Sequence, residues 1–226
     1  MLHINMLSLV SIESIPHLLG ILAFGLHILA YTVYGYHIFK GRIRPNAISW
    51  FMWLTGGVIE YLTYDALLGS QWFTSALPLA CVVGISGIFL ITLYAQVMER
   101  LKKKSEKAIY HKPEKLDYYL TSFDLGAGVI WVVSGAAAFA NFLAVSTSIL
   151  TFIPIWKTTL KHGEEHPAPW ILWSAAYLCM FLAVLFEGGE GIYSRLFYPG
   201  YYFVLHFVMA LLAYETLRRF ILKKYF

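Results

Sequence analysis

The chain has 226 residues, of which 59% are hydrophobic and only 13% are charged, with a formal net charge of +4. An ordinary soluble domain carries about 25% charged residues, and one of this length has no core large enough to hide so many apolar side chains. The composition excludes an ordinary soluble enzyme domain and favours one compact membrane domain, and the small net charge does not indicate a nucleic-acid partner.

Seven runs of the sequence are long enough to cross a bilayer, which takes about 20 apolar residues per helix. In chain order we expect spans at His17–Phe39, Ala47–Leu68, Thr74–Val97, Tyr118–Phe139, Asn141–Leu160, Pro169–Phe186 and Tyr198–Phe220. The stretch from 118 to 160 has almost no break. It is too long for one span and just long enough for two, so we place its turn near Ala140–Asn141.

The basic residues predict how these spans are oriented. They follow the first, third, fifth and seventh spans, at Lys40, Arg42 and Arg44, at 99–115, at Lys157 and Lys161, and at 218–224. Cytoplasmic loops of membrane proteins are enriched in Lys and Arg. We therefore expect an outside N-terminus, a cytoplasmic C-terminus and a multi-pass protein of a bacterial or archaeal cell membrane. Only Arg195 breaks the pattern.

One motif occurs twice, as GRIRPNAISWFMW at 41–53 and KHGEEHPAPWILW at 161–173. Both Trp pairs, Trp50 with Trp170 and Trp53 with Trp173, are 120 residues apart. Matching them places spans 1 to 3 on spans 5 to 7. The predicted fold is an all-α membrane protein of two parallel three-helix repeats, 1–98 and 141–226, joined by a loop and linker helix at 99–140. Alternatively, the motif marks an interfacial aromatic belt twice.

Three stretches, YGYHIFKGRIRPNAISWFMW, FDLGAGVIW and IPIWKTTLKHGEEHPAPWILW, give the chain a resemblance to a known group. It resembles the SWEET/PQ-loop superfamily, in particular uncharacterised bacterial PQ-loop-like proteins, and more distantly PnuC-type transporters. The resemblance implies a small-solute transporter, for a sugar, nucleoside, vitamin or similar solute, that works by alternating access. The chain departs from the pattern because it has no Pro-Gln dipeptide and no proline inside its first span.

Polar and aromatic side chains within the spans are the candidate substrate contacts. Glu60 lies mid-span, seven residues after Trp53, so the two share a helix face. Its carboxylate could bind a cation, carry a coupled proton, or serve as a neutral structural group. The full candidate set is Trp50, Trp53, Glu60, Asn141, Trp170, Trp173, Ser174 and Tyr177. In it, Trp53 and Trp173 would stack on a substrate, whereas Trp50 and Trp170 lie nearer the interface and Asn141 could equally cap a helix.

A second set of residues is expected at the cytoplasmic end, where salt bridges could gate the substrate path. It consists of Arg42, Arg44, Pro154, Lys157, Glu164 and Glu165. A static interfacial ion pair is the equally weighted alternative.

Other functions are weighed against transport. A sensor or assembly protein could keep this fold and move nothing. A haem-binding redox protein would need facing imidazoles, for which only His27 and His206 qualify, and a core role is the default for both. We predict no enzymatic activity and no cofactor. The expected partners are a small-molecule substrate and the lipid bilayer, with the protein acting alone or as a homo-oligomer.

Overall fold

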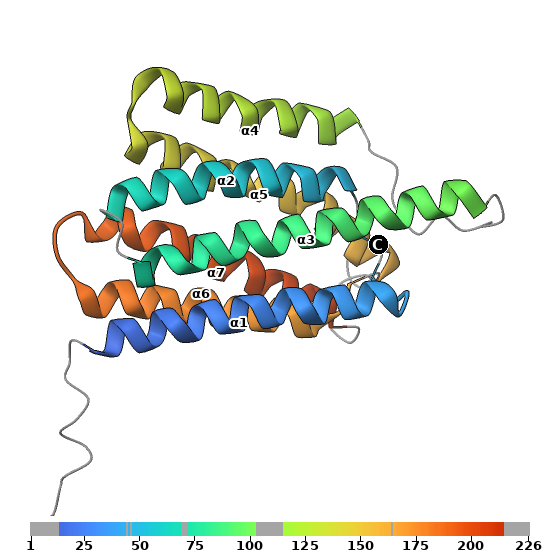
Figure 1. Cartoon of the computed structure of the whole chain (residues 1–226), viewed down its shortest axis with the longest axis horizontal. Helices are drawn as coiled ribbons and strands as arrows, with labels where there is room; N and C mark the ends of the chain where they lie inside the picture. The colour runs from blue at the N-terminus through green and yellow to red at the C-terminus, as the bar shows by residue number, and fades with distance from the viewer. Residues whose placement is uncertain are drawn as a thin grey trace, which may run out of the picture.

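The computed structural model describes residues 14–43, 45, 47–68, 72–102, 115–163 and 165–214, and over these residues the chain is helical without strands. The helices are α1 (Ser14–Phe39), α2 (Ala47–Leu68), α3 (Trp72–Lys102), α4 (Lys115–Ser134), α5 (Ala137–His162), α6 (Pro167–Glu187) and α7 (Ile192–Ala213). Successive helices run back and forth between the two ends of one bundle (Figure 1).

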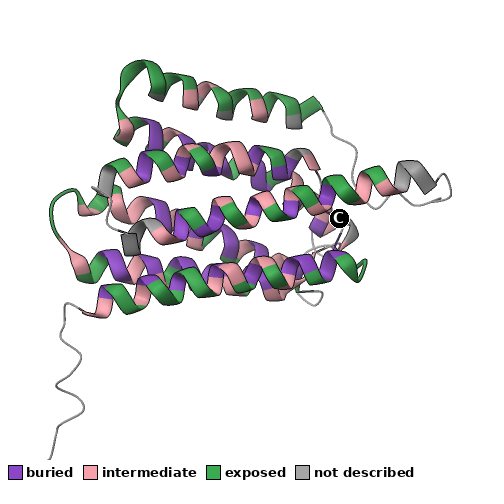
Figure 2. Cartoon of the chain, in the orientation of Figure 1, coloured by how far each residue is buried: buried purple, intermediate pink, exposed green. Residues whose placement is uncertain are grey.

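Five of the described helices are long and apolar enough to cross a membrane. They are α1, α5, α6 and α7, together with Ala76–Met98 of α3. The helix α2 is not among them and carries Glu60 and Asp65. Exposed residues line the outer surfaces of the bundle while buried ones face inward (Figure 2), and many of the exposed ones are large and apolar. Such a surface suits a membrane-embedded protein.

Two predicted helix boundaries are wrong. The break between the fourth and fifth helices lies at Gly135–Ala136, not near Ala140–Asn141, and Gly135 has a φ of 64°. Glycine adopts this left-handed conformation without a Cβ clash. The last helix begins at Ile192, before the predicted start at Tyr198, and Pro199 lies inside it. Its predicted end at Phe220 lies outside the described residues.

Helix packing follows the same pattern in the two halves of the chain. Within the halves, α3 packs on both α1 and α2, and α7 packs on both α5 and α6. Between the halves, α1 packs on α6, α2 on α5, α3 on α6 and α2 on α7. Exchanging α1, α2 and α3 for α5, α6 and α7 leaves this set of pairs unchanged. The helix α4 lies outside the exchange and packs on α2 and α5 (Figure 1).

Large aromatic side chains fill the centre of the bundle. Trp50 and Trp170 are 1% and 0% exposed, and Tyr34, Tyr177 and Trp173 are also among the fully buried side chains. The interfacial-belt alternative is therefore wrong for the first tryptophan of each motif, since a belt residue would face lipid headgroups. Both instead lie in the interior of the bundle, where Trp170 packs on Tyr34 and Trp53 of the other half.

Candidate functional site: a cavity between the two halves

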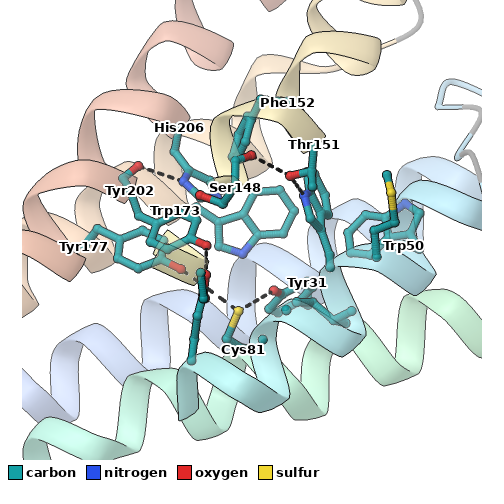
Figure 3. Close-up of a pocket in the computed structure, with 17 residues that line it drawn as sticks. Tyr31, Trp50, Cys81, Ser148, Thr151, Phe152, Trp173, Tyr177, Tyr202 and His206 are labelled. Carbon is teal, nitrogen blue, oxygen red and sulfur yellow. Dashed lines mark hydrogen bonds between the residues drawn. The ribbon is translucent and has the colours of Figure 1, made fainter. Parts of the chain in front are cut away.

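A cavity lies where the two halves meet, and six helices contribute to its walls (Figure 3). Its lining residues are Tyr31 of α1, Trp50, Met52, Trp53, Gly56, Gly57 and Glu60 of α2, Cys81 and Ile85 of α3, Ala144, Ser148, Thr151 and Phe152 of α5, Trp173 and Tyr177 of α6, and Tyr202 and His206 of α7. About 40 Å³ is open to the centres of water-sized molecules. Since one water needs on the order of 10–15 Å³ of such space, the cavity holds a few waters in this conformation.

Glu60 is the acidic side chain of the cavity wall, and no Lys or Arg is among the lining residues. It is 4% exposed and accepts a hydrogen bond from the hydroxyl of Tyr202. This bond joins α2 of the first half to α7 of the second across the cavity. Trp53 was predicted from its seven-residue spacing to share a helix face with Glu60, and it lines the same cavity.

Tyr202 also orients the imidazole of His206. Nδ1 of His206 lies 2.8 Å from the backbone carbonyl oxygen of Tyr202. A carbonyl oxygen can only accept, so Nδ1 carries the hydrogen and neutral His206 keeps Nε2 as an acceptor. One residue of α7 therefore sets the position of both the carboxyl and the imidazole in the cavity.

A thiol and two phenol hydroxyls form a second polar region of the cavity wall. The Sγ atom of Cys81 lies 3.4 Å from the hydroxyl of Tyr31 and 4.0 Å from the hydroxyl of Tyr177 (Figure 3). Cys81 therefore lies in the cavity wall, between an α1 and an α6 side chain.

The second tryptophan of each motif contacts the first helix of the other half. The indole N–H of Trp53 donates to the hydroxyl of Thr151 in α5, and the Trp173 ring packs on Tyr31 in α1 with centroids 5.0 Å apart. Tyr31 and Thr151 are themselves 120 residues apart. The two contacts differ in one respect, because Nε1 of Trp173 is buried without a hydrogen-bond partner in the described part of the chain.

Five of the eight predicted substrate contacts line the cavity: Trp50, Trp53, Glu60, Trp173 and Tyr177. The other three do not. Trp170 lies behind the wall, with its ring centroid 6.2 Å from that of Trp53. Ser174 donates to the carbonyl oxygen of Trp170 at 2.7 Å. Asn141 lies inside α5, so it does not cap that helix, and it donates to Thr63 of α2 at 3.0 Å.

The cavity is bounded on one side by contacts around Glu165, which we call the Glu165 closure. Glu165 precedes α6 and accepts hydrogen bonds from the hydroxyl of Tyr34 in α1, at 3.0 Å, and from the indole of Trp170, at 2.9 Å. Beside it the rings of His37 and His166 are stacked 3.9 Å apart. Burial and the nearby charge of Arg42 lower the pKa of His166 below its ordinary value.

The predicted gating residues fall at this same end or outside the described chain. Glu165 takes part in the closure. Arg42 and Lys157 are exposed, and Pro154 lies half-buried within α5. Arg44 and Glu164 lie outside the described residues.

On the other side the halves are joined at Arg195, which we call the Arg195 closure. The hydroxyl of Tyr64 in α2 donates to the backbone carbonyl of Arg195 in α7 at 2.9 Å. The Arg195 side chain pairs with Glu187 at the end of α6 and donates to the carbonyl of Gly188 at 2.9 Å. The ring centroids of Tyr64 and Tyr198 are 4.7 Å apart. Contacts between the halves therefore exist at both ends of the cavity.

The two histidines of the haem alternative lie around one tyrosine. The ring centroid of Tyr177 is 5.2 Å from that of His27 and 4.9 Å from that of His206. His27 is buried, and both of its nitrogens lack a hydrogen-bond partner among the described residues, so it is packed against aromatic rings rather than hydrogen-bonded. This packing supports a core role for both rings.

Sequence reasoning missed several lining residues, among them Tyr31, Ser148, Thr151 and Tyr202. Tyr31 and Thr151 could have been found by applying the 120-residue offset of the motif to the first helix of each half. Tyr202 offered no such signal. Comparison of the chain with models of known protein families, with curated proteins and with solved structures finds no match.

Proposed function

We propose that the protein is a small-solute transporter in which the two three-helix halves move against each other and expose the cavity to one side at a time. The observation that carries this proposal is the cavity itself. Each of the six helices of the two halves contributes to its wall, and contacts between the halves bound it at both ends.

The size of the cavity supports a conformational cycle. A space for a few waters is too small for a sugar, nucleoside or amino acid, so a substrate can enter only after one closure opens. Opening the Glu165 closure breaks the hydrogen bond from Tyr34 to Glu165, and opening the Arg195 closure breaks that from Tyr64 to the Arg195 carbonyl. We assign this structure to the occluded state, from which rocking of the halves would open either end.

The exchange of helix pairs supports a duplicated architecture as part of the proposal. We propose seven spans in a 3 + 1 + 3 arrangement of the SWEET/PQ-loop type, with an outside N-terminus and the Glu165 closure on the cytoplasmic side. In this arrangement α2 is the span whose acidic residue, Glu60, is turned toward the other half and away from lipid.

Distances between spin labels at the two ends test the cycle. One label pair, at Arg42→Cys and Lys157→Cys, reports on the Glu165 end. The other, at Leu18→Cys and Tyr193→Cys, reports on the Arg195 end; all four side chains are exposed. The background carries Cys81→Ala and Cys179→Ala. In liposomes we expect two populations in which one distance is long when the other is short.

Solutes found by thermal stabilisation should shift these populations, because a ligand favours the conformation that it binds. Uptake of such a solute into proteoliposomes then measures transport directly. One narrow distance in each pair, unchanged by every stabilising solute, would contradict the proposal and favour a sensor or assembly protein.

A further inference from the structure

One hydrogen bond at the cavity is present on one side of the repeat and missing on the other. The indole N–H of Trp53 donates to the hydroxyl of Thr151. The corresponding neighbour of Trp173 is Tyr31, which packs on Trp173 through its ring and keeps its hydroxyl 3.4 Å from Sγ of Cys81. Nε1 of Trp173 is therefore left without an acceptor in the described part of the chain.

This N–H belongs to a residue of the cavity wall (Figure 3). Trp173 is 2% exposed, so water outside the protein does not reach it. An indole N–H can only donate, and buried polar groups in proteins nearly always have a partner. A molecule that enters the cavity can supply the acceptor that the described chain does not. The donor would then fix which end of that molecule points toward α6.

The other lining residues restrict the charge and the shape of such a molecule. Neither Lys nor Arg is among the lining residues of the described chain, so a buried anion would have no counter-charge there. A protonated amine or amidine has no acceptor to offer to an N–H. Tyr177 and Tyr202 lie stacked with ring centroids 5.2 Å apart, and Trp50, Trp53 and Phe152 add further rings. Walls of this kind suit a flat ring that stacks on them.

We propose that the cavity binds an uncharged, flat solute whose carbonyl oxygen or ring nitrogen accepts a hydrogen bond from Nε1 of Trp173, with the aromatic rings as its walls. This inference rests on the proposed function, since the ligand enters only when one closure opens. It makes Trp173 the residue that selects for an acceptor, whereas the N–H of Trp53 is already bonded within the protein.

Probes of matched shape separate the acceptor from the charge. Benzamide is compared with the anion benzoate and the cation benzamidine, and 1-methyl-2-pyridone is compared with o-xylene, which has a methyl group in place of the carbonyl oxygen. Binding to the purified full chain is measured by thermal stabilisation at known free probe concentrations. We expect benzamide to bind at least about tenfold more tightly than either charged probe, and the pyridone to exceed o-xylene by a similar factor, the effect of one hydrogen bond made to a buried donor.

Tryptophan variants then locate the donor. Trp173→Phe keeps an aromatic ring but removes the N–H, so it should abolish the preference of the pyridone over o-xylene. Trp156→Phe also removes a buried N–H without a partner in the described chain, but from a residue outside the cavity wall, and should leave the preference intact.

A spectroscopic measurement on the wild type does not depend on whether Trp173→Phe folds. In the chain labelled with ¹⁵N-tryptophan, saturating benzamide should move the indole N–H resonance of Trp173 downfield. The N–H resonance of Trp53 should not show this downfield shift, because its hydrogen bond to Thr151 is already made.

The results have separate meanings. No binding of benzamide or the pyridone, equal binding within either probe set, a preference that survives in folded Trp173→Phe, or an unmoved Trp173 resonance would overturn the inference. Benzamide binding at Trp173 with spin-label distances that never change would uphold the ligand class and remove transport. Distances that change only with sugars, without an effect on the Trp173 resonance, would uphold transport and overturn the inference.

Discussion

The hydroxyl of Tyr64 donates a hydrogen bond to the backbone carbonyl of Arg195, which lies in the other half of the chain. Pro199 explains why that carbonyl is free. In a helix the carbonyl of residue 195 would accept from the N–H of residue 199, but proline has no N–H. The proline inside α7 thus creates an acceptor, and α2 supplies the donor that fills it.

Replacing this donor should weaken the contact between the halves. Tyr64→Phe leaves the Arg195 carbonyl without this donor in a partly buried site, which costs about 1 kcal/mol. Denaturation of the purified protein should show this loss. Tyr61→Phe, a matched change on the same helix, should have little effect. Equal stability of the two variants would contradict the role of Tyr64 in the closure.

Gly84 gives a second prediction, because it lies against the cavity residue Tyr31. A Cβ atom on Gly84 would lie 2.0 Å from a Tyr31 ring atom, whereas a Cβ on Gly87 would meet nothing within 4 Å. Gly84→Ala should therefore displace the Tyr31 ring, lengthen its contact with Cys81 and cost about 1–3 kcal/mol. Gly87→Ala should be neutral or stabilise the helix by up to about 1 kcal/mol. Thermal unfolding of both variants measures the difference, and a stable Gly84→Ala protein would show that the ring can move without loss.

Trp53 and Trp173, the second tryptophans of the two motifs, should differ in the cost of losing their indole N–H. Trp53→Phe removes a hydrogen bond to Thr151, whereas Trp173→Phe removes a buried N–H that has no partner among the described residues. We expect the first variant to be less stable than the second by about 1 kcal/mol, the usual net value of one hydrogen bond. Chemical denaturation of both proteins tests the order. The reverse order would mean that the N–H of Trp173 is hydrogen-bonded and that of Trp53 contributes nothing.

The success and failure of the helix prediction have local causes. The bounds of α2 were predicted correctly because polar residues precede Ala47 and a Gly-Ser-Gln stretch follows Leu68. The start of α7 was predicted at Tyr198 instead of Ile192, and Pro199 lies within the helix, where Tyr64 provides a partner for the freed carbonyl. The break at Gly135 was missed because the small residues around it give no contrast in hydrophobicity.

Site residues were predicted where local helical periodicity is sufficient and missed where the packing of distant helices decides their position. Helical periodicity was enough to place Trp53 and Glu60 on one face. The partner of Glu60 depends on how α7 is positioned along α2, and no sequence pattern contains that register, so Tyr202 was not predicted. Sequence alone also did not separate Trp170 from Trp50, its counterpart in the repeated motif. In the structure Trp50 lines the cavity, whereas Trp170 lies behind its wall.

The stacked histidines at the Glu165 closure predict a loss of stability in acid. Nδ1 of His166 accepts the backbone N–H of Ala168 at 3.3 Å and so caps α6 in the neutral form. Protonation would replace this acceptor with a donor and place a charge against His37 and near Arg42, with Glu165 as the neighbouring negative group. Because the pKa of His166 is lowered in the folded protein, the unfolded chain binds the proton more tightly. The contribution of neutral His166 to stability is therefore complete at pH values above its ordinary pKa of 6.5, and it falls as the pH decreases below that value. Loss of the cap alone costs about 1 kcal/mol, or about 2–4 °C in Tm.

Thermal unfolding between pH 8 and pH 5 should show this decrease in the wild type. His166→Asn, which can cap the helix but does not titrate in this range, should reduce it, whereas His17→Gln, a change of an exposed histidine near the start of α1, should not. An unchanged pH dependence in His166→Asn would exclude the stacked pair as the acid-sensitive element.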